Sequence, residues 1–304
     1  MQKKVIMLFL DGVGAGRKNE KINPFFNTKL PAIRYVLDDG IPHIKMREVC
    51  KRNLYYRNIN ATLGIDGLPQ SGTGQTSLLC GLNASKIIGK HFGPYPYSTL
   101  IDFIREYNIF SSLQRYGFKT FYVNAYPPKY FEYIQRKKLR RTATTLAWTF
   151  AGKELNDYRT LQNNESLSSD ITGEKWNALG FPKVKEISPE SAGKRLVSFL
   201  KEYDFVFYEY FYTDHAGHSQ SMDLAVKELQ KVDGLISGIV SSLDVNNMTL
   251  IITSDHGNIE DLGIKTHTRN PVPLIVYGEM CKYLNTKIKS ITQISREIIN
   301  FYNK

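Results

Sequence analysis

The chain has 304 residues, of which 42% are hydrophobic and 23% charged, which is typical of a soluble globular protein with one large domain or a core carrying a modest insertion. Its net charge of +11 favours an anionic partner, namely nucleic acid, a membrane surface or a phosphorylated small molecule. Cys50, Cys80 and Cys281 are scattered without a CxxC pair, which argues against a disulfide framework or a thiolate zinc site and suits a reducing cytoplasm.

The first predicted element is a core strand at residues 5–10. Two lysines precede its apolar run "VIMLFL", as in a signal peptide. The run is nevertheless too short for a signal sequence or a membrane span, and it stops at Asp11. We therefore expect a cytoplasmic protein with no membrane partner.

Four further apolar runs have the length of strands, and two helical patterns separate them. The runs are continuously apolar, as strands buried on both faces tend to be; they occupy residues 120–125, 205–211, 248–254 and 272–278. A helix begins after Ser188 as N-cap with Pro189 in its first position, and residues 221–243 keep helical apolar spacing. This alternation predicts an α/β fold with a mainly parallel sheet.

Residues 126–186 interrupt the alternation. They include a basic cluster and continue through polar sequence; the cluster consists of Arg136, Lys137, Lys138, Arg140 and Arg141. We interpret this segment as a small inserted basic cap and expect residues 1–125 and 187–304 to form the α/β core. A surface excursion of the core is the alternative interpretation.

Three of the predicted strands are followed by an aspartate. These residues are Asp11, Asp214 and Asp255. Ligands of open α/β sheets bind outside the carboxyl ends of the strands, where residues distant in sequence converge. One aspartate in such a place is commonplace, but three of them indicate a site.

Histidines accompany these aspartates. His218 lies four residues after Asp214, so one turn of helix places both on one face; His256 follows Asp255 directly, and His267 precedes the last strand. Three carboxylates and three imidazoles without thiolate suit Zn(II) or Mn(II). Six ligands exceed one tetrahedral shell, so the sequence predicts two divalent ions, an arrangement suited to phosphoryl transfer.

A nucleophile is available in "GLPQSGTGQTSLLCGLNA", residues 67–84. This stretch offers the hydroxyls of Ser71, Thr73, Thr76 and Ser77 before an apolar helical turn. The dipole of a helix favours an anion and a bound phosphate at its N-terminus. Taken alone, the stretch is also compatible with an ordinary loop.

Together, five motifs resemble the metalloenzyme branch of the alkaline phosphatase superfamily, which includes cofactor-independent phosphoglycerate mutase and phosphopentomutase. In chain order they are "FLDGVG", "PQSGTGQTS", "TDHAGH", "TSDHGN" and "THTRNPVP". The resemblance covers roughly residues 1–125 and 187–304. It implies a three-layer α/β/α core of the alkaline phosphatase type with a small inserted cap.

The resemblance also implies roles for the site residues. One metal ion would be held by Asp214, His218 and His267. The other would be held by a hydroxyl and three further ligands, which are Asp11, Asp255 and His256.

For that hydroxyl we expect Thr73, because Thr73-Gly74 resembles the start of the phosphopentomutase motif. Neither family's full local motif is present, so Ser71 and Thr76 remain alternatives. Arg269 is a candidate phosphate ligand, with a surface salt bridge as the other interpretation, and His215 is expected outside the ligand shell.

The predicted function is dinuclear-metal-dependent phosphoryl transfer on a small phosphorylated substrate through a phosphothreonine intermediate. The mutases of this branch are longer and use their caps to retain the phosphorylated intermediate, so the short cap favours a phosphatase or phosphodiesterase-type hydrolase. A phosphomutase is the alternative. A catalytically silent anion- or nucleic-acid-binding protein is the alternative of another class, and the complete ligand set argues against it.

Overall fold

A computed structural model describes residues 3–136, 140–284 and 288–304. Its main sheet has seven strands in the order β2-β3-β9-β8-β1-β7-β4. Four consecutive strands of this sheet run parallel to one another: β8 (Met248–Thr253), β1 (Lys4–Leu10), β7 (Phe205–Tyr210) and the edge strand β4 (Thr120–Tyr122). β9 (Val272–Gly278), β3 (Leu54–Ile59) and β2 (Val49–Lys51) continue it with antiparallel pairings.

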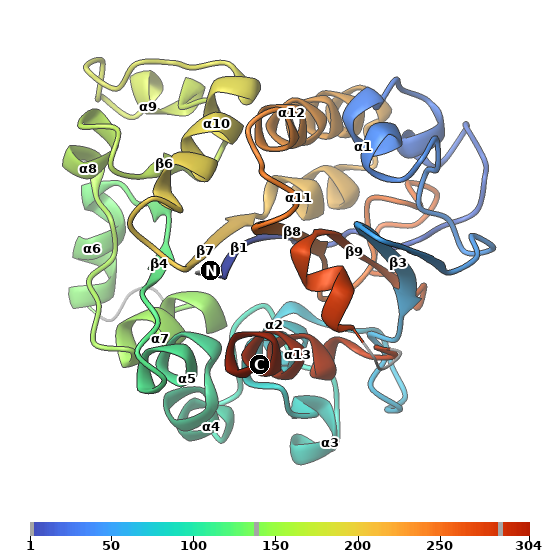
Figure 1. The fold of residues 1–304 in the computed structure, drawn as a ribbon, viewed down its shortest axis with the longest axis horizontal. Coiled ribbons are helices and arrows are strands. Elements are labelled where there is room, and N and C mark those ends of the chain that lie inside the picture. The colour runs from blue at the N-terminus through green and yellow to red at the C-terminus, as the bar shows by residue number, and fades with distance from the viewer. Residues whose placement is uncertain (1–2, 137–139, 285–287) are drawn as a thin grey trace.

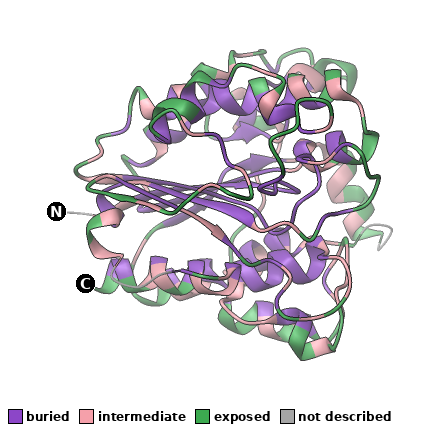
Figure 2. Ribbon diagram, turned by 90° about the vertical axis from the view of Figure 1, so that its right-hand side faces the viewer, coloured by how far each residue is buried: buried purple, intermediate pink, exposed green. Residues whose placement is uncertain are grey.

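Helices cover both faces of this sheet, which gives three layers (Figures 1 and 2). One layer contains α1 (Pro31–Val36), α10 (Pro189–Phe199), α11 (Tyr212–Ser219) and α12 (Met222–Val240). The other contains α2 (Ser71–Cys80), α3 (Ala84–Ile88), α4 (Leu100–Tyr107), α5 (Ile109–Arg115), α7 (Ala143–Phe150) and α13 (Ile294–Asn303). The predicted α/β fold with a mainly parallel sheet is confirmed.

The central strands are buried along almost their whole length, as their continuous apolar runs predict (Figure 2). Ser188 accepts a hydrogen bond from the backbone N–H of Ser191, and Pro189 opens α10. The predicted start of this helix is therefore confirmed. Among the described residues, no helix is long and apolar enough to cross a membrane.

The run at residues 120–125 forms two short strands instead of one. β4 ends at Tyr122, and β5 (Asn124–Ala125) pairs with β6 (Leu167–Ser168) in a separate two-stranded sheet. The side chain of Asn124 causes the departure, because its amide donates to the Glu209 carbonyl at 2.7 Å and accepts from the Glu209 N–H at 2.9 Å. These side-chain bonds replace the backbone ladder at the end of β7.

The interval 126–186 lies beside the β4 edge of the sheet (Figure 1). It contains α6 (Pro128–Gln135), α8 (Tyr158–Gln162) and α9 (Glu174–Ala178) in addition to β6 and α7. Helix α7 packs in the same layer as α2, and its Trp148 ring lies 5.2 Å from that of Phe110 on α5. The division into a core and a cap stays a prediction, and Lys137 and Lys138 of the basic cluster lie outside the described residues.

Within the described ranges, three short 3-10 helices complete the fold. They are η1 (Pro24–Phe26), η2 (Glu279–Tyr283) and η3 (Ile291–Gln293). The sequence patterns considered above predict neither these nor the β2–β3 hairpin, which extends the sheet away from the site.

Candidate metal centre

The residues predicted to bind metal converge at the carboxyl ends of three parallel strands. Asp11 follows β1, Asp214 lies in the first turn of α11 just after β7, and Asp255 follows β8. Gly12 lets the loop after β1 approach α11, because a Cβ atom at this position would lie 2.5 Å from Asp214 Oδ1. Its φ of +69° also suits glycine.

The first group consists of Asp214, His218 and His267. Nε2 of His218 lies 3.4 Å from Asp214 Oδ2, and Nε2 of His267 lies 3.5 Å from Asp214 Oδ1. The two Nε2 atoms are 3.1 Å apart. Ligands about 2.1 Å from one tetrahedral ion would be separated by roughly 3.4 Å, which matches this spacing.

The tautomers of these two histidines are fixed by backbone carbonyls. Nδ1 of His218 lies 2.9 Å from the Lys265 carbonyl, and Nδ1 of His267 lies 2.7 Å from the Pro69 carbonyl. Each Nδ1 therefore carries the proton and donates it, leaving a lone pair on Nε2. Two lone pairs that face each other at 3.1 Å cannot form a hydrogen bond but can share a cation.

The second group lies next to the first. Nε2 of His256 is 3.4 Å from Asp11 Oδ1 and 3.6 Å from Asp255 Oδ2. Ligand atoms of Asp11, Asp214 and His256 all lie within 4.8 Å of one another, so Asp214 is shared by the two groups. Among the described residues, Oδ1 of Asp11 and Oδ2 of Asp255 are buried without a hydrogen-bond partner.

The pKa shifts in the cluster also favour a bound cation, because among the described residues buried carboxylates lie close together without a positive charge between them. Burial, together with the charges of Asp255 and Asp214, raises the pKa of Asp11 well above its usual value. Burial and the charge of Asp214 likewise raise the pKa of Asp255. Burial, assisted by the neighbouring His267, lowers the pKa of His256 to about 3, so this imidazole is neutral.

Asp214 behaves differently from the other two carboxylates. Burial opposes its charge, but the hydrogen bond to His218 and the nearby His256 outweigh burial and hold the pKa of Asp214 below its usual range. The same hydrogen bond raises the pKa of His218. Ionised or neutral acceptors thus surround a space with unpartnered buried oxygens, and this donor set fits divalent cations.

Of the candidate nucleophiles, Ser71 reaches the cluster. It occupies the first position of α2, and its Oγ lies 2.9 Å from Nε2 of His256. Ser71 also lines the same cavity as Asp11 and Asp214. The helix dipole of α2 favours negative charge at this end.

Thr73 and Thr76 make other contacts. Thr73 is fully buried; its hydroxyl donates to the Gln70 carbonyl at 3.1 Å and accepts from the Phe92 N–H at 3.3 Å. The Thr76 hydroxyl is also fully buried and donates to the Gly72 carbonyl at 2.6 Å. Neither side chain lines the cavity.

Two supporting residues were missed by the sequence reasoning. The Asn258 amide donates to Asp214 Oδ1 at 2.7 Å and so orients a ligand shared by both groups. Glu260 is buried and accepts from the N–H groups of Gly14 and Asn258 at 2.8 and 2.7 Å and from the Thr268 hydroxyl. It thereby ties together the loops that carry Asp11, His256 and His267, and its plain sequence context gives no signal of this role.

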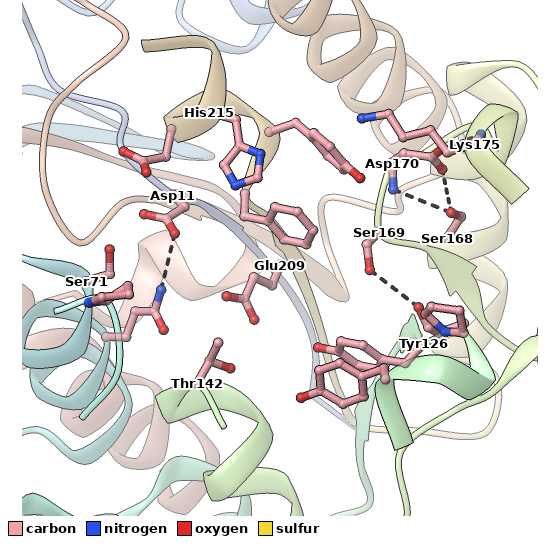
Figure 3. A pocket seen from close by; sticks show the side chains of 18 of the residues that line it. Asp11, Ser71, Tyr126, Thr142, Ser168, Ser169, Asp170, Lys175, Glu209 and His215 are labelled. Carbon is pink, nitrogen blue, oxygen red and sulfur yellow. Dashed lines mark hydrogen bonds between the residues drawn. The ribbon is translucent and has the colours of Figure 1, made fainter. Parts of the chain in front are cut away.

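A cavity of about 540 Å³ adjoins the cluster and extends toward the interval 126–186 (Figure 3). His215 lines it from α11, and Arg140 lines it from the basic cluster. Arg269 is exposed and donates to the Gly67 carbonyl at 3.0 Å, and it is not part of the cavity wall.

Curated relatives match only part of this chain. A 2,3-bisphosphoglycerate-independent phosphoglycerate mutase from Pyrococcus abyssi is 35% identical over 85 residues, which are 28% of this chain and 20% of that protein. The enzyme of the same name from Idiomarina loihiensis is 31% identical over 137 residues, which are 40% of this chain and 27% of that protein. The chain thus spans 20% and 27% of the length of these two relatives.

Solved structures match nearly the whole fold at low sequence identity. The PH0037 protein from Pyrococcus horikoshii aligns with a TM-score of 0.58 at 15% identity, covering 100% of this chain and 97% of that one. Leishmania mexicana phosphoglycerate mutase gives 0.58 at 10% identity and covers 99% and 95%. The alkaline phosphatase of the Antarctic bacterium TAB5 gives 0.51 at 13% identity and covers 100% and 99%. These likenesses confirm the predicted alkaline-phosphatase-like fold.

A family model extends the match from the fold to the sequence. The model of the Metalloenzyme superfamily matches residues 3–301, an interval that includes every strand end and histidine of the cluster. The prediction of a metal-dependent enzyme of this group is confirmed at the level of the family: the chain belongs to the Metalloenzyme superfamily.

Proposed function

We propose that this protein is a metal-dependent phosphoryl-transfer enzyme that hydrolyses a phosphate ester, with Ser71 as the nucleophile. The observation that carries the proposal is the contact of Ser71 Oγ with His256 Nε2 at 2.9 Å, beside buried carboxylate oxygens and at the mouth of a cavity. Ser71 replaces Thr73 in this proposal because the Thr73 hydroxyl is buried and occupied by backbone partners.

Two divalent ions would be held by the two groups described above. Asp214, His218 and His267 would hold one, and the other would be held by Asp11, Asp255, His256 and Ser71. Zn(II) and Mn(II) fit these oxygen and nitrogen donors. When bound, the ions would supply positive charge that stabilises the transferring phosphoryl group and the oxygens on either side of it.

The chain's own residues would position the reaction. Ser71 gives its proton to water, its Oγ bonds to phosphorus, and the bond from phosphorus to the leaving oxygen breaks; the leaving alcohol takes up a proton. The N-terminus of α2 favours the phosphorylated Ser71. Water then attacks the phosphoserine, which releases phosphate and restores the hydroxyl.

Access of water favours hydrolysis over return of the phosphoryl group to a second hydroxyl. The His218 side chain is 43% exposed, so solvent reaches the first ligand group directly. A phosphomutase remains the second candidate because the curated relatives described above are phosphoglycerate mutases.

The test uses protein reconstituted with Mn(II) or Zn(II) and p-nitrophenyl phosphate. Wild-type protein and Thr73→Ala should release phosphate, whereas Ser71→Ala should lose this activity while retaining most of its bound metal. Circular dichroism confirms that each variant is folded. Activity that survives in Ser71→Ala and disappears in folded Thr73→Ala would overturn the assignment. Isomerisation of phosphoglycerates or phosphosugars without release of phosphate would show that the protein is a phosphomutase and not a hydrolase.

A further inference from the structure

Glu209 is a buried carboxylate that the proposed chemistry does not use. It lies near the end of β7, is 4% exposed, and lines the cavity beside Asp11. Figure 3 shows its side chain pointing into the cavity between Asp11 and Tyr126. The two hydrogen bonds between the Asn124 amide and the backbone of Glu209 hold it in this position.

Two tyrosines orient the Glu209 carboxylate. The Tyr122 hydroxyl donates to Glu209 Oε2 at 3.0 Å, and the Tyr126 hydroxyl lies 2.6 Å from that of Tyr122. The single hydroxyl proton of Tyr122 is already donated to Glu209, so in the second hydrogen bond Tyr126 is the donor and Tyr122 the acceptor. The hydroxyl protons of Tyr122 and Tyr126 are therefore both engaged in hydrogen bonds within the cavity wall. The lone pairs of the Tyr126 oxygen remain available to accept a hydrogen bond from a ligand.

Two further polar atoms in the wall have no hydrogen-bond partner among the described residues. The Gln75 amide nitrogen donates to Asp11 Oδ2 at 3.3 Å, and a carboxylate can only accept, so the amide oxygen of Gln75 faces elsewhere. That oxygen and the Tyr130 hydroxyl are buried without a partner, and both residues line the cavity. Buried polar atoms in this state are costly unless a ligand or water satisfies them.

The remaining wall contains several aromatic rings, and two of its charged groups, Lys175 and Asp170, are already engaged. Tyr126 and Tyr130 stack with ring centroids 4.3 Å apart. The Lys175 ammonium lies 3.2 Å from the ring centroid of Tyr212, and Asp170 accepts from the N–H groups of Gly173 and Lys175. Glu209, Gln75 and Tyr126 thus offer acceptors to a ligand, whereas the Tyr130 hydroxyl can donate or accept and Arg140 lines the cavity from the basic cluster.

We propose that Glu209, Gln75, Tyr126 and Tyr130 form the subsite for the leaving group and select a phosphate ester whose alcohol carries hydrogen-bond donors, hydroxyls or an ammonium group. A leaving group with a carboxylate would add acceptors and negative charge beside Glu209, and the subsite disfavours it. The inference rests on the proposed function, because it takes Ser71 as the attacking group. It makes Glu209 a specificity-determining residue.

The experiment compares wild type, Glu209→Gln and the control Glu228→Gln, which changes a buried carboxylate outside the cavity. Metal-loaded protein is assayed at pH 8, above the Glu209 pKa of about 7, with ribose 5-phosphate, phosphoethanolamine, 3-phosphoglycerate and p-nitrophenyl phosphate. Wild type should prefer at least one of the first two over 3-phosphoglycerate by about tenfold or more in kcat/KM. If ribose 5-phosphate has the higher kcat/KM, hydroxyls of the leaving group supply the donors. If phosphoethanolamine has the higher value, the ammonium group supplies them.

Glu209→Gln should lose most of this preference, chiefly through KM. The control Glu228→Gln should hydrolyse p-nitrophenyl phosphate about as fast as wild type. Glu228→Gln should retain the preference. Equal or better use of 3-phosphoglycerate by wild type, or an unchanged preference in Glu209→Gln, would overturn the inference.

Binding separates this inference from the proposed function. Calorimetric titration of metal-loaded Ser71→Ala with the three natural esters should give the same order of affinities even if no turnover is found with any variant. If no ester is hydrolysed but the affinities keep this order, the proposed hydrolase function is wrong and the subsite inference stands. If 3-phosphoglycerate binds more tightly than the other two esters, the proposed specificity of the subsite is wrong.

Discussion

His218 and His267 bring their Nε2 atoms to within 3.1 Å while each donates its Nδ1 proton to a backbone carbonyl. The carbonyls that fix the two rings belong to Lys265 and Pro69, far from each other in the chain. The fold therefore presents two lone pairs to one point in space. A metal ion between the two rings would use both lone pairs, and in the metal-free protein a proton on Nε2 of His218, whose pKa the hydrogen bond with Asp214 raises, would relieve their repulsion.

Replacement of His267 should therefore remove one of the two proposed ions. We expect His267→Gln to bind about half as much Zn(II) or Mn(II) as wild type by elemental analysis after reconstitution, since the second group keeps its own ligands. His43→Gln is the matched control, because His43 hydrogen-bonds the Ile41 carbonyl away from the cluster. Equal metal content in His267→Gln and wild type would exclude His267 as a ligand.

Asp255→Asn should stabilise the metal-free protein. Asp255 is fully buried, one of its oxygens has no partner among the described residues, and burial together with Asp214 raises its pKa. Removing this charge relieves repulsion within the cluster but weakens the second ligand group. Thermal denaturation in EDTA should show a higher Tm for the variant, and added metal should raise its Tm less than that of wild type. A lower Tm in EDTA would contradict the electrostatic account.

Glu209 should make stability depend on pH. Burial, partly offset by the hydrogen bond from Tyr122, raises the pKa of Glu209 from 4.5 to about 7. Below pH 4.5 the residue is protonated in both states; between 4.5 and about 7 only the unfolded state loses the proton, so the free energy of unfolding falls as the pH rises. The full effect amounts to about 3 kcal/mol.

Urea denaturation in EDTA at pH 4.5 and pH 8 measures this effect. Glu209→Gln cannot ionise, so its stability relative to wild type should increase over this interval. The pKa values of Asp11 and Asp255 are also raised. The difference between the two proteins reports Glu209 together with the effect of its charge on the pKa of Asp11. The same stability difference at both pH values would show that Glu209 ionises normally.

Glu260 should support metal binding without being a ligand. Glu260→Ala leaves the buried N–H groups of Gly14 and Asn258 without their acceptor, which costs about 2 to 3 kcal/mol of stability and loosens the loops that carry the ligands. Glu260→Gln retains an acceptor oxygen, so its loss of stability and of Zn(II) affinity should be smaller. Competition with a chromogenic chelator measures the affinity. Unchanged affinity in a folded Glu260→Ala protein would rule out the supporting role.

The convergence of the proposed metal ligands was predictable from the sequence because the fold obeys a simple rule. Asp11, Asp214 and Asp255 each follow a buried apolar run, and parallel strands bring their carboxyl ends to one edge. The Asp214–His218 spacing of one helical turn needs no tertiary information. The strand ends and the Asp214–His218 spacing are enough to group the proposed ligands. The orientation of their side chains depends on partners such as Asn258, which the sequence alone does not connect to Asp214.

The proposed nucleophile was harder to identify from the sequence because helical phase decides which hydroxyl faces the ligand groups. Ser71 and Thr73 project roughly 200° apart around α2, so only one can face the metal groups. No side-chain cap marks the start of α2, and its glycine-rich sequence has almost no apolar stripe to show which face is buried. Glu209 was missed for a related reason: within "FVFYEYF" it looks like a polar interruption of a strand, and the departure of Asn124 from the sheet is what places it at a cavity.

The most direct test of the account is to locate the phosphoryl group on the enzyme. Metal-loaded protein is mixed with p-nitrophenyl phosphate, quenched in acid within the first turnovers, digested and analysed by tandem mass spectrometry. The account predicts one phosphorylated residue, Ser71, in wild type and none in Ser71→Ala. A phosphoryl group on Thr73 or Thr76, or rapid phosphate release with no phosphorylated residue, would contradict it.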